Sequence, residues 1–144
     1  MIAAVLPYAR GRLEALGLTE WIDGFNAENI PSTQLDNTFM VDLGTITTRQ
    51  MNQTDLVLEV PFIVTIFKSV IRDNNQRIDD AISSADSVID EMLKVSNRLN
   101  QSVTGDYLKD VKFSSMAIEP LNATDDNGVV VKMEFRAILM RCTA

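Results

Sequence analysis

The residue types that carry out most acid–base and nucleophilic chemistry are nearly absent from this chain. Its 144 residues include no histidine and a single cysteine, Cys142, two residues from the end. Histidine is the usual general base at neutral pH, so its absence excludes Ser-His-Asp and Cys-His nucleophilic schemes. It also removes the commonest zinc ligand, which one cysteine cannot replace. Six scattered glycines form no phosphate-binding loop.

Carboxylates are the remaining groups that could act as acids, bases or Mg²⁺ ligands. One acidic group of the sequence consists of Asp79, Asp80, Asp86, Asp90 and Glu91. These residues fall on the polar side of an amphipathic helical pattern, where charge is expected in any case. The run 125–127 lacks the spacing of a calcium-binding loop and is typical of a tight turn. We therefore expect no enzymatic activity, no bound metal and no cofactor.

Length and composition indicate one globular domain spanning residues 1–144. Hydrophobic residues make up 46% of the chain and charged residues 23%, which is ordinary globular composition. The net charge of −7 repels phosphate backbones and disfavours sequence-specific nucleic-acid binding. The negative charge either keeps the protein soluble or lines a passage through which DNA slides without sticking. No run approaches 18 uncharged apolar residues, so we expect no membrane span.

Two segments have the apolar spacing of a helix. The first predicts a short helix from Ile2 or Leu6 to Leu16, with Gly17 placed to cap it in a left-handed conformation. The second predicts a long amphipathic helix over Ile78–Leu99, which is the strongest periodic pattern in the chain.

Alternation of apolar and polar residues indicates strands. It predicts four of them: Phe39–Leu43, Leu56–Phe67, Val111–Glu119 and Val129–Leu139. The segments 18–37 and 100–109 are expected to be loops, 45–55 to be strand tips around an extended hairpin loop, and Asp126-Asn127-Gly128 a tight turn. The predicted fold is α+β, in the order α-β-β-α-β-β. A mostly antiparallel four-stranded sheet would carry the long helix on one face, together with the short N-terminal helix.

The strand at 56–67 has unusual features. Its even positions are apolar and predict a buried face, whereas Pro61 cannot donate to a ladder, so one side of the strand is an edge or carries a bulge. The odd positions include Val57, Ile63 and Phe67, which makes both faces apolar. We expect the second face to be covered by the N-terminal helix or by another subunit.

The polar segment 45–55 is longer than a hairpin connection needs, and such loops are often functional. Thr47, Arg49, Gln50 and Met51 are therefore candidates for contact with a neighbouring subunit or an adjacent ring.

The order and size of these elements resemble the lambda-type tail terminator proteins of long-tailed bacteriophages. The matching stretches are RLEALG (12–17), FMVDLG, LVLEVPFIVTIF, IDDAISSADSVIDEML and VVVKMEFRAILM. The resemblance implies a virion structural protein, made in the host cytoplasm, that forms a hexameric ring. Such a ring caps the tail tube protein and docks onto a neck or head-completion protein, while DNA passes through without specific binding.

Two alternatives remain open. One is another phage neck, tail-completion or tube component. The other is a non-enzymatic module that binds a peptide or small ligand.

Overall fold

The computed structural model describes residues 5–20, 38–50, 55–69, 74–94, 106–120 and 128–142. Within these ranges the elements are α1 (Val5–Ala15), β1 (Thr19–Glu20), β2 (Thr38–Leu43), β3 (Thr47–Gln50), β4 (Asp55–Ser69), α2 (Asn74–Leu93), β5 (Asp106–Pro120) and β6 (Gly128–Cys142). The predictions made for Ile2, Met51, Leu99 and the turn at 126–127 lie outside the described residues.

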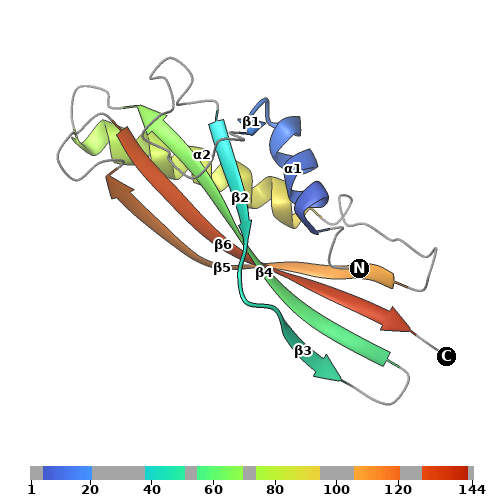
Figure 1. Ribbon diagram of the computed structural model, residues 1–144. Coiled ribbons are helices and arrows are strands. Elements are labelled where there is room, and N and C mark those ends of the chain that lie inside the picture. Colours follow the sequence, from blue (N-terminus) through green and yellow to red (C-terminus); the bar gives the residue numbers. More distant parts are fainter. Residues whose placement is uncertain are drawn as a thin grey trace.

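The strands form one sheet in the order β1-β2-β4-β6-β5, and β3 also pairs with β4 (Figure 1). Strand β1 runs parallel to β2, and every other pairing is antiparallel. Both helices contact the same face of the sheet, so the architecture is two-layered. In Figure 1 the end of the sheet that carries β3 extends past the helices.

The prediction of a mostly antiparallel four-stranded sheet is wrong. The sheet in the structure has six strands and is mixed, and the described part of the chain is mostly β with two helices. Of the two additional strands, β1 lies in a segment predicted as a loop, and β3 lies in the segment predicted as strand tips around an extended hairpin loop. Strand β1 has two residues, too few to show a period, and β3 is the polar run TTRQ, which forms a strand because it pairs with β4. Strand β5 also begins earlier than predicted, at Asp106.

Helix α1 ends as its sequence predicts. Gly17 has φ of 84°, and its N–H donates to the Glu14 carbonyl at 2.9 Å. The Leu18 N–H donates to the Leu13 carbonyl at 3.3 Å. These two bonds form a Schellman motif, which satisfies carbonyls that the helix itself leaves unpaired.

Helix α2 is displaced from its predicted range and runs from Asn74 to Leu93 instead of Ile78 to Leu99. The apolar stripe begins one turn after the helix does, because the first turn is polar. Ala81, Ala85, Val88 and Met92 are buried against the sheet. The four-three-four spacing of these residues keeps one face of the helix toward the core.

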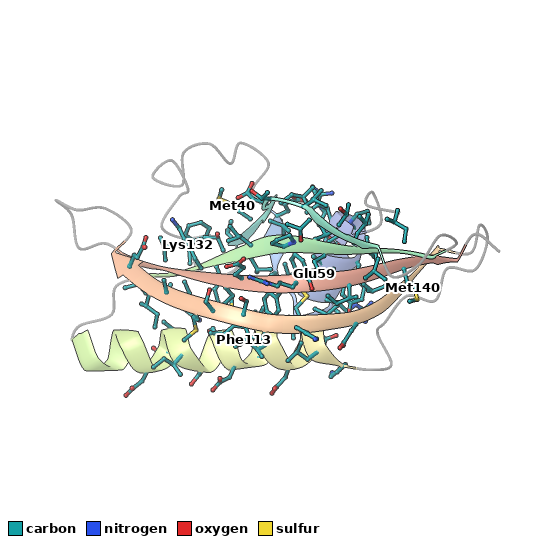
Figure 2. The ribbon with its side chains drawn as sticks, turned by 90° about the horizontal axis from the view of Figure 1, so that it is seen from below. Met40, Glu59, Phe113, Lys132 and Met140 are labelled. Atoms are coloured by element: carbon teal, nitrogen blue, oxygen red, sulfur yellow. The ribbon has the colours of Figure 1, made fainter. Side chains whose placement is uncertain are left out.

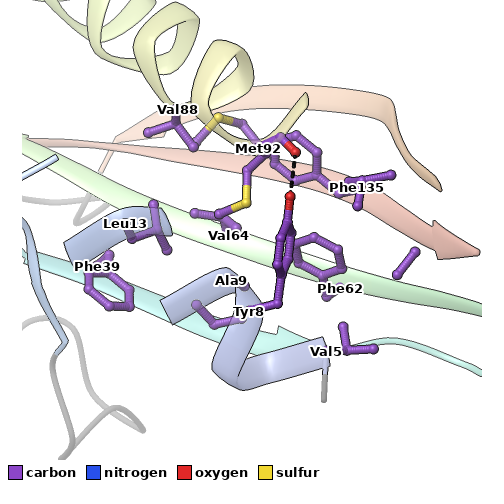
Figure 3. Packing of buried hydrophobic residues seen from close by; sticks show 14 of the residues in the cluster. Val5, Tyr8, Ala9, Leu13, Phe39, Phe62, Val64, Val88, Met92 and Phe135 are labelled. Atoms are coloured by element: carbon purple, nitrogen blue, oxygen red, sulfur yellow. Dashed lines mark hydrogen bonds between the residues drawn. The ribbon is translucent and has the colours of Figure 1, made fainter. Parts of the chain in front are cut away.

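The centre of the core lies on the helix-covered face of β4 and β6, which pair with each other over 15 residues. Phe62 and Phe135 lie directly opposite each other, are fully buried, and stack with ring centroids 5.4 Å apart. From α1, the buried Tyr8 hydroxyl donates to the Met92 carbonyl at 3.0 Å (Figure 3). This bond joins the two helices and satisfies a carbonyl in the last turn of α2.

Pro61 lies at a bulge. Leu43 pairs with Phe62 and Thr47 pairs with Glu59, so three residues of one chain segment oppose two of β4. The Gly44 N–H donates to the Pro61 carbonyl at 2.8 Å, so the proline nitrogen, which has no hydrogen, faces this bulge. The predicted bulge is therefore confirmed. The alternative, an edge strand, is wrong because β4 has neighbours on both sides.

We expect the bulge to require glycine at position 44. A Cβ atom there would lie 3.0 Å from the Pro61 Cβ, whose ring cannot move aside easily. Gly44→Ala should therefore lower the free energy of unfolding by about 1–3 kcal/mol, measured by urea denaturation. The matched control is Gly11→Ala in α1, where no atom lies within 4 Å. It should raise stability by about 0.5–1 kcal/mol. Equal effects at the two sites would contradict the bulge geometry.

Candidate interaction surface

The sheet has one face without a covering layer among the described elements. We call it the open face, and Figure 2 shows it on the side of the sheet away from α2, with Met40 and Lys132 on it. The strand registers place these residues on it: Met40, Asp42, Thr47, Val57, Glu59, Ile63, Thr65, Phe67, Asp110, Lys112, Ser115, Ala117, Glu119, Val130, Lys132, Glu134, Arg136, Ile138 and Met140.

Charged side chains on the open face pair across strands. Lys132 Nζ lies 3.6 Å from a Glu119 carboxylate oxygen, and Arg136 lies 3.8 Å from Glu59. The side chains of Lys132 and Arg136 are 52% and 49% exposed. Exposed pairs of this kind contribute little to stability because water screens both charges. The part of the open face around these two ion pairs is therefore hydrated.

The three apolar residues predicted to need a second subunit have different environments. Val57 and Phe67 are 6% and 1% exposed within the single chain, and Ile63 is half-buried. Strand β4 has a paired strand on each side. Val57 lies opposite Met140, and Phe67 lies opposite Val130. Val57 and Phe67 are thus shielded in one copy and offer little surface to another.

The predicted contact segment is partly a strand. Thr47 is exposed on the open face opposite Glu59. Arg49 and Gln50 belong to β3 and pair through their backbones with β4, while their side chains and Met51 lie outside the described part of the structure. Strand β3 lies at the end of the sheet that extends beyond the helices (Figure 1).

Strand β5 forms one edge of the sheet. Its residues from Lys112 to Ala117 are exposed, including Phe113 at 38% and Met116 at 40%. Extra residues at Lys109 and Ser114 interrupt the register with β6. Bulges of this kind limit unwanted pairing along an edge, because they break a long run of free backbone groups into short ones.

The opposite edge is formed by β2, which β1 covers only at Thr38 and Phe39. The remainder of β2 has no described neighbour on that side, and it includes exposed Asp42 and Leu43, the latter 40% exposed. Leu43 and Phe113 lie in predicted strands, but the alternation of apolar and polar residues does not reveal that these strands form the edges of the sheet, so it did not predict their exposure.

The acidic residues of α2 do not assemble into a site. Asp79, Asp86 and Asp90 are exposed, whereas Glu91 is 9% exposed and pairs with Lys94 at 2.8 Å and Arg12 at 3.7 Å. Within the described ranges, no group of three acidic or thiol side chains is arranged to hold a metal ion. Neither described helix is both long and apolar enough to cross a membrane.

One hollow lies between α1, α2 and the end of β4. Its volume is about 230 Å³, below the roughly 300–1,000 Å³ of ordinary ligand pockets. Its lining comprises Leu16, Leu18, Ile66, Phe67, Lys68, Ser84, Ser87 and Val88. Among the residues that the structure describes, the open face and the two sheet edges are therefore the principal candidate surfaces.

No protein-family model matches the sequence, and no curated protein is significantly similar to it.

We expect the open face to tolerate loss of charge. Lys132→Ala should lower the free energy of unfolding by less than about 1 kcal/mol, because the ion pair with Glu119 is half exposed. Phe135→Ala, on the helix-covered face of the same strand, should lower it by about 3–5 kcal/mol, because Phe135 is fully buried. Both values are measured by urea denaturation. A loss above about 2 kcal/mol for Lys132→Ala would show that the open face is not hydrated.

Proposed function

We propose that this protein is a ring-forming structural subunit of a phage tail, a tail terminator that closes the tail tube and joins it to the neck. The observation that carries the proposal is the asymmetry of the sheet. Both described helices pack on one face, while the other face carries cross-strand ion pairs whose lysine and arginine are half exposed. A layer of this kind suits the wall of a ring, with the helices outside and the open face toward a water-filled channel.

The charge of the open face is compatible with a DNA passage. Carboxylates outnumber cations among its described side chains, and DNA is repelled by a surface of its own sign. The carboxylates are Asp42, Glu59, Asp110, Glu119 and Glu134, and the cations are Lys112, Lys132 and Arg136. DNA would therefore slide through the ring without being held.

The two edges of the sheet support a ring in preference to a two-fold dimer. One edge is the single long, bulged strand β5. The opposite edge is made of three short strands, since β2 and β3 pair with successive parts of β4 and β1 covers part of β2. Different edges favour head-to-tail contacts, which close into a ring when the rotation per copy permits. The number six comes from the resemblance to tail terminators.

The extended end of the sheet is the part proposed to meet the next component of the tail or neck. It carries β3, with Thr47, Arg49 and Gln50, and it leads into Met51. The proposed partners are the tail tube protein on one side and a head-completion protein on the other.

Negative-stain microscopy and native mass spectrometry of the purified chain test this proposal. We expect closed rings of six copies with an open centre at micromolar concentration, and binding of these rings to the ends of tail tubes. Open polymers would indicate a tube component instead. A species that stays monomeric at about 100 μM, far above ordinary assembly affinities, would contradict the proposal.

A further inference from the structure

A single row of core-facing side chains crosses the sheet from edge to edge. Phe113 of β5 lies opposite Phe135, Phe135 opposite Phe62, and Phe62 opposite Leu43 of β2. The rings of Phe113 and Phe135 are in edge-to-face contact at 5.6 Å. The two inner residues are fully buried, while Phe113 and Leu43 are 38% and 40% exposed. The apolar layer is thus incomplete at both edges, at the same level along the strands.

The two edges also carry opposite charges beside these apolar residues. Lys112 precedes Phe113 and Asp42 precedes Leu43, and both charged side chains lie exposed on the open face. In the described part of the chain, neither Lys112 nor Asp42 forms an ion pair. One edge therefore offers an unpaired cation and the other an unpaired carboxylate.

Strand direction permits the two edges to meet. The antiparallel pairings make β2 and β6 run one way and β4 and β5 the other. Rotation about an axis parallel to the strands preserves those directions. In a ring built by such a rotation, β5 of one copy would therefore be antiparallel to β2 of the next.

One register between β5 and the β2 of the next copy places apolar residues opposite each other on the helix side and opposite charges opposite each other on the open face. With Lys112 opposite Asp42 of the next copy, Phe113 lies opposite Val41 and Val111 lies opposite Leu43. Each of these four apolar residues faces the helix side in its own chain, so like faces meet. In this register Val111–Phe113 pairs with Val41–Leu43, and these three pairs lie within the regular run of β5 between its two bulges and within the uncovered run of β2.

We propose that the sheet continues from one copy to the next through this junction, with Lys112 and Phe113 of β5 against Asp42 and Val41 of the neighbouring β2. The occupant of each edge is a second copy of this chain. The junction rests on the proposed ring and specifies how the ring closes. The junction gives Phe113 and Leu43, at the two ends of the apolar row, an apolar neighbour on the adjoining copy. It also brings Lys112 and Asp42 opposite each other, and opposite charges in directly opposed cross-strand positions are stabilising.

Disulfide trapping tests the junction directly. In a Cys142→Ser background, the pair Asp42→Cys and Lys112→Cys should form disulfides between copies under mild oxidation. Within one chain the two positions are separated by three strand spacings, about 14 Å, which exceeds the reach of a disulfide. We expect a ladder of crosslinked species that ends at the closed ring. The control pair, Asp42→Cys with Lys132→Cys, places one thiol on the exposed open face of an inner strand and should give no ladder.

Charge reversal tests the same junction without cysteine. Lys112→Glu and Asp42→Lys should each weaken assembly by at least about tenfold in sedimentation velocity, and the double variant should recover most of that loss. Lys132→Glu is the control and should assemble normally. Rings that form but show no selective crosslinking would overturn this junction and leave the proposed function standing. Crosslinking that stops at a dimer would overturn head-to-tail closure, and absence of any assembly of the wild-type chain would overturn both proposals.

Discussion

The structure depends on the pairing of β4 with β6. The two strands match over 15 residues, and Val60, Phe62 and Val64 of β4 are fully buried with Val131, Met133 and Phe135 of β6. Burial of this apolar face is the main source of stabilisation in such a domain. Every other element is organised around this pair: β2 and β3 divide one side of β4 between them, β5 takes the free side of β6, and both helices cover the shared apolar face.

The bulge between Gly44 and Thr47 determines how the β2 side is divided. It separates β2 from β3 at the point where Pro61 has no N–H to offer, so a residue that would weaken a continuous ladder lies where the ladder is already interrupted. The same interruption directs β3 along the part of the sheet that extends beyond the helices (Figure 1). Pro61 thus lies at the boundary between the body of the domain and its projecting end.

The distribution of exposure follows from the position of each strand. Val57 and Phe67 are apolar residues on the open face of β4, which has neighbours on both sides, and both are buried within the single chain. Phe113 and Leu43 face the helices, yet they are more than a third exposed because β5 and β2 lie at the edges. Surfaces available to another copy are therefore at the edges of the sheet, whereas the part of the open face around the two ion pairs is hydrated and charged. This separation suits the proposed channel-lining role, in which the lateral edges join neighbouring copies and the ion-paired part of the open face stays in contact with water.

Local patterns in the sequence determined much of this protein. Period-two alternation located the buried faces of β4 and β6, helical spacing located α1 and most of α2, and Gly17 marked the Schellman cap, because each of these features is set by residues close together in the chain. The absence of histidine likewise limits the available chemistry whatever fold the chain adopts. Tertiary structure alone decided the number of strands, since β1 and β3 are too short or too polar to form without a partner strand. It also decided which strands are central and which are edges. That choice made Val57 and Phe67 interior residues and left Phe113 and Leu43 exposed, because burial depends on neighbours that are distant in sequence and no alternation pattern records them.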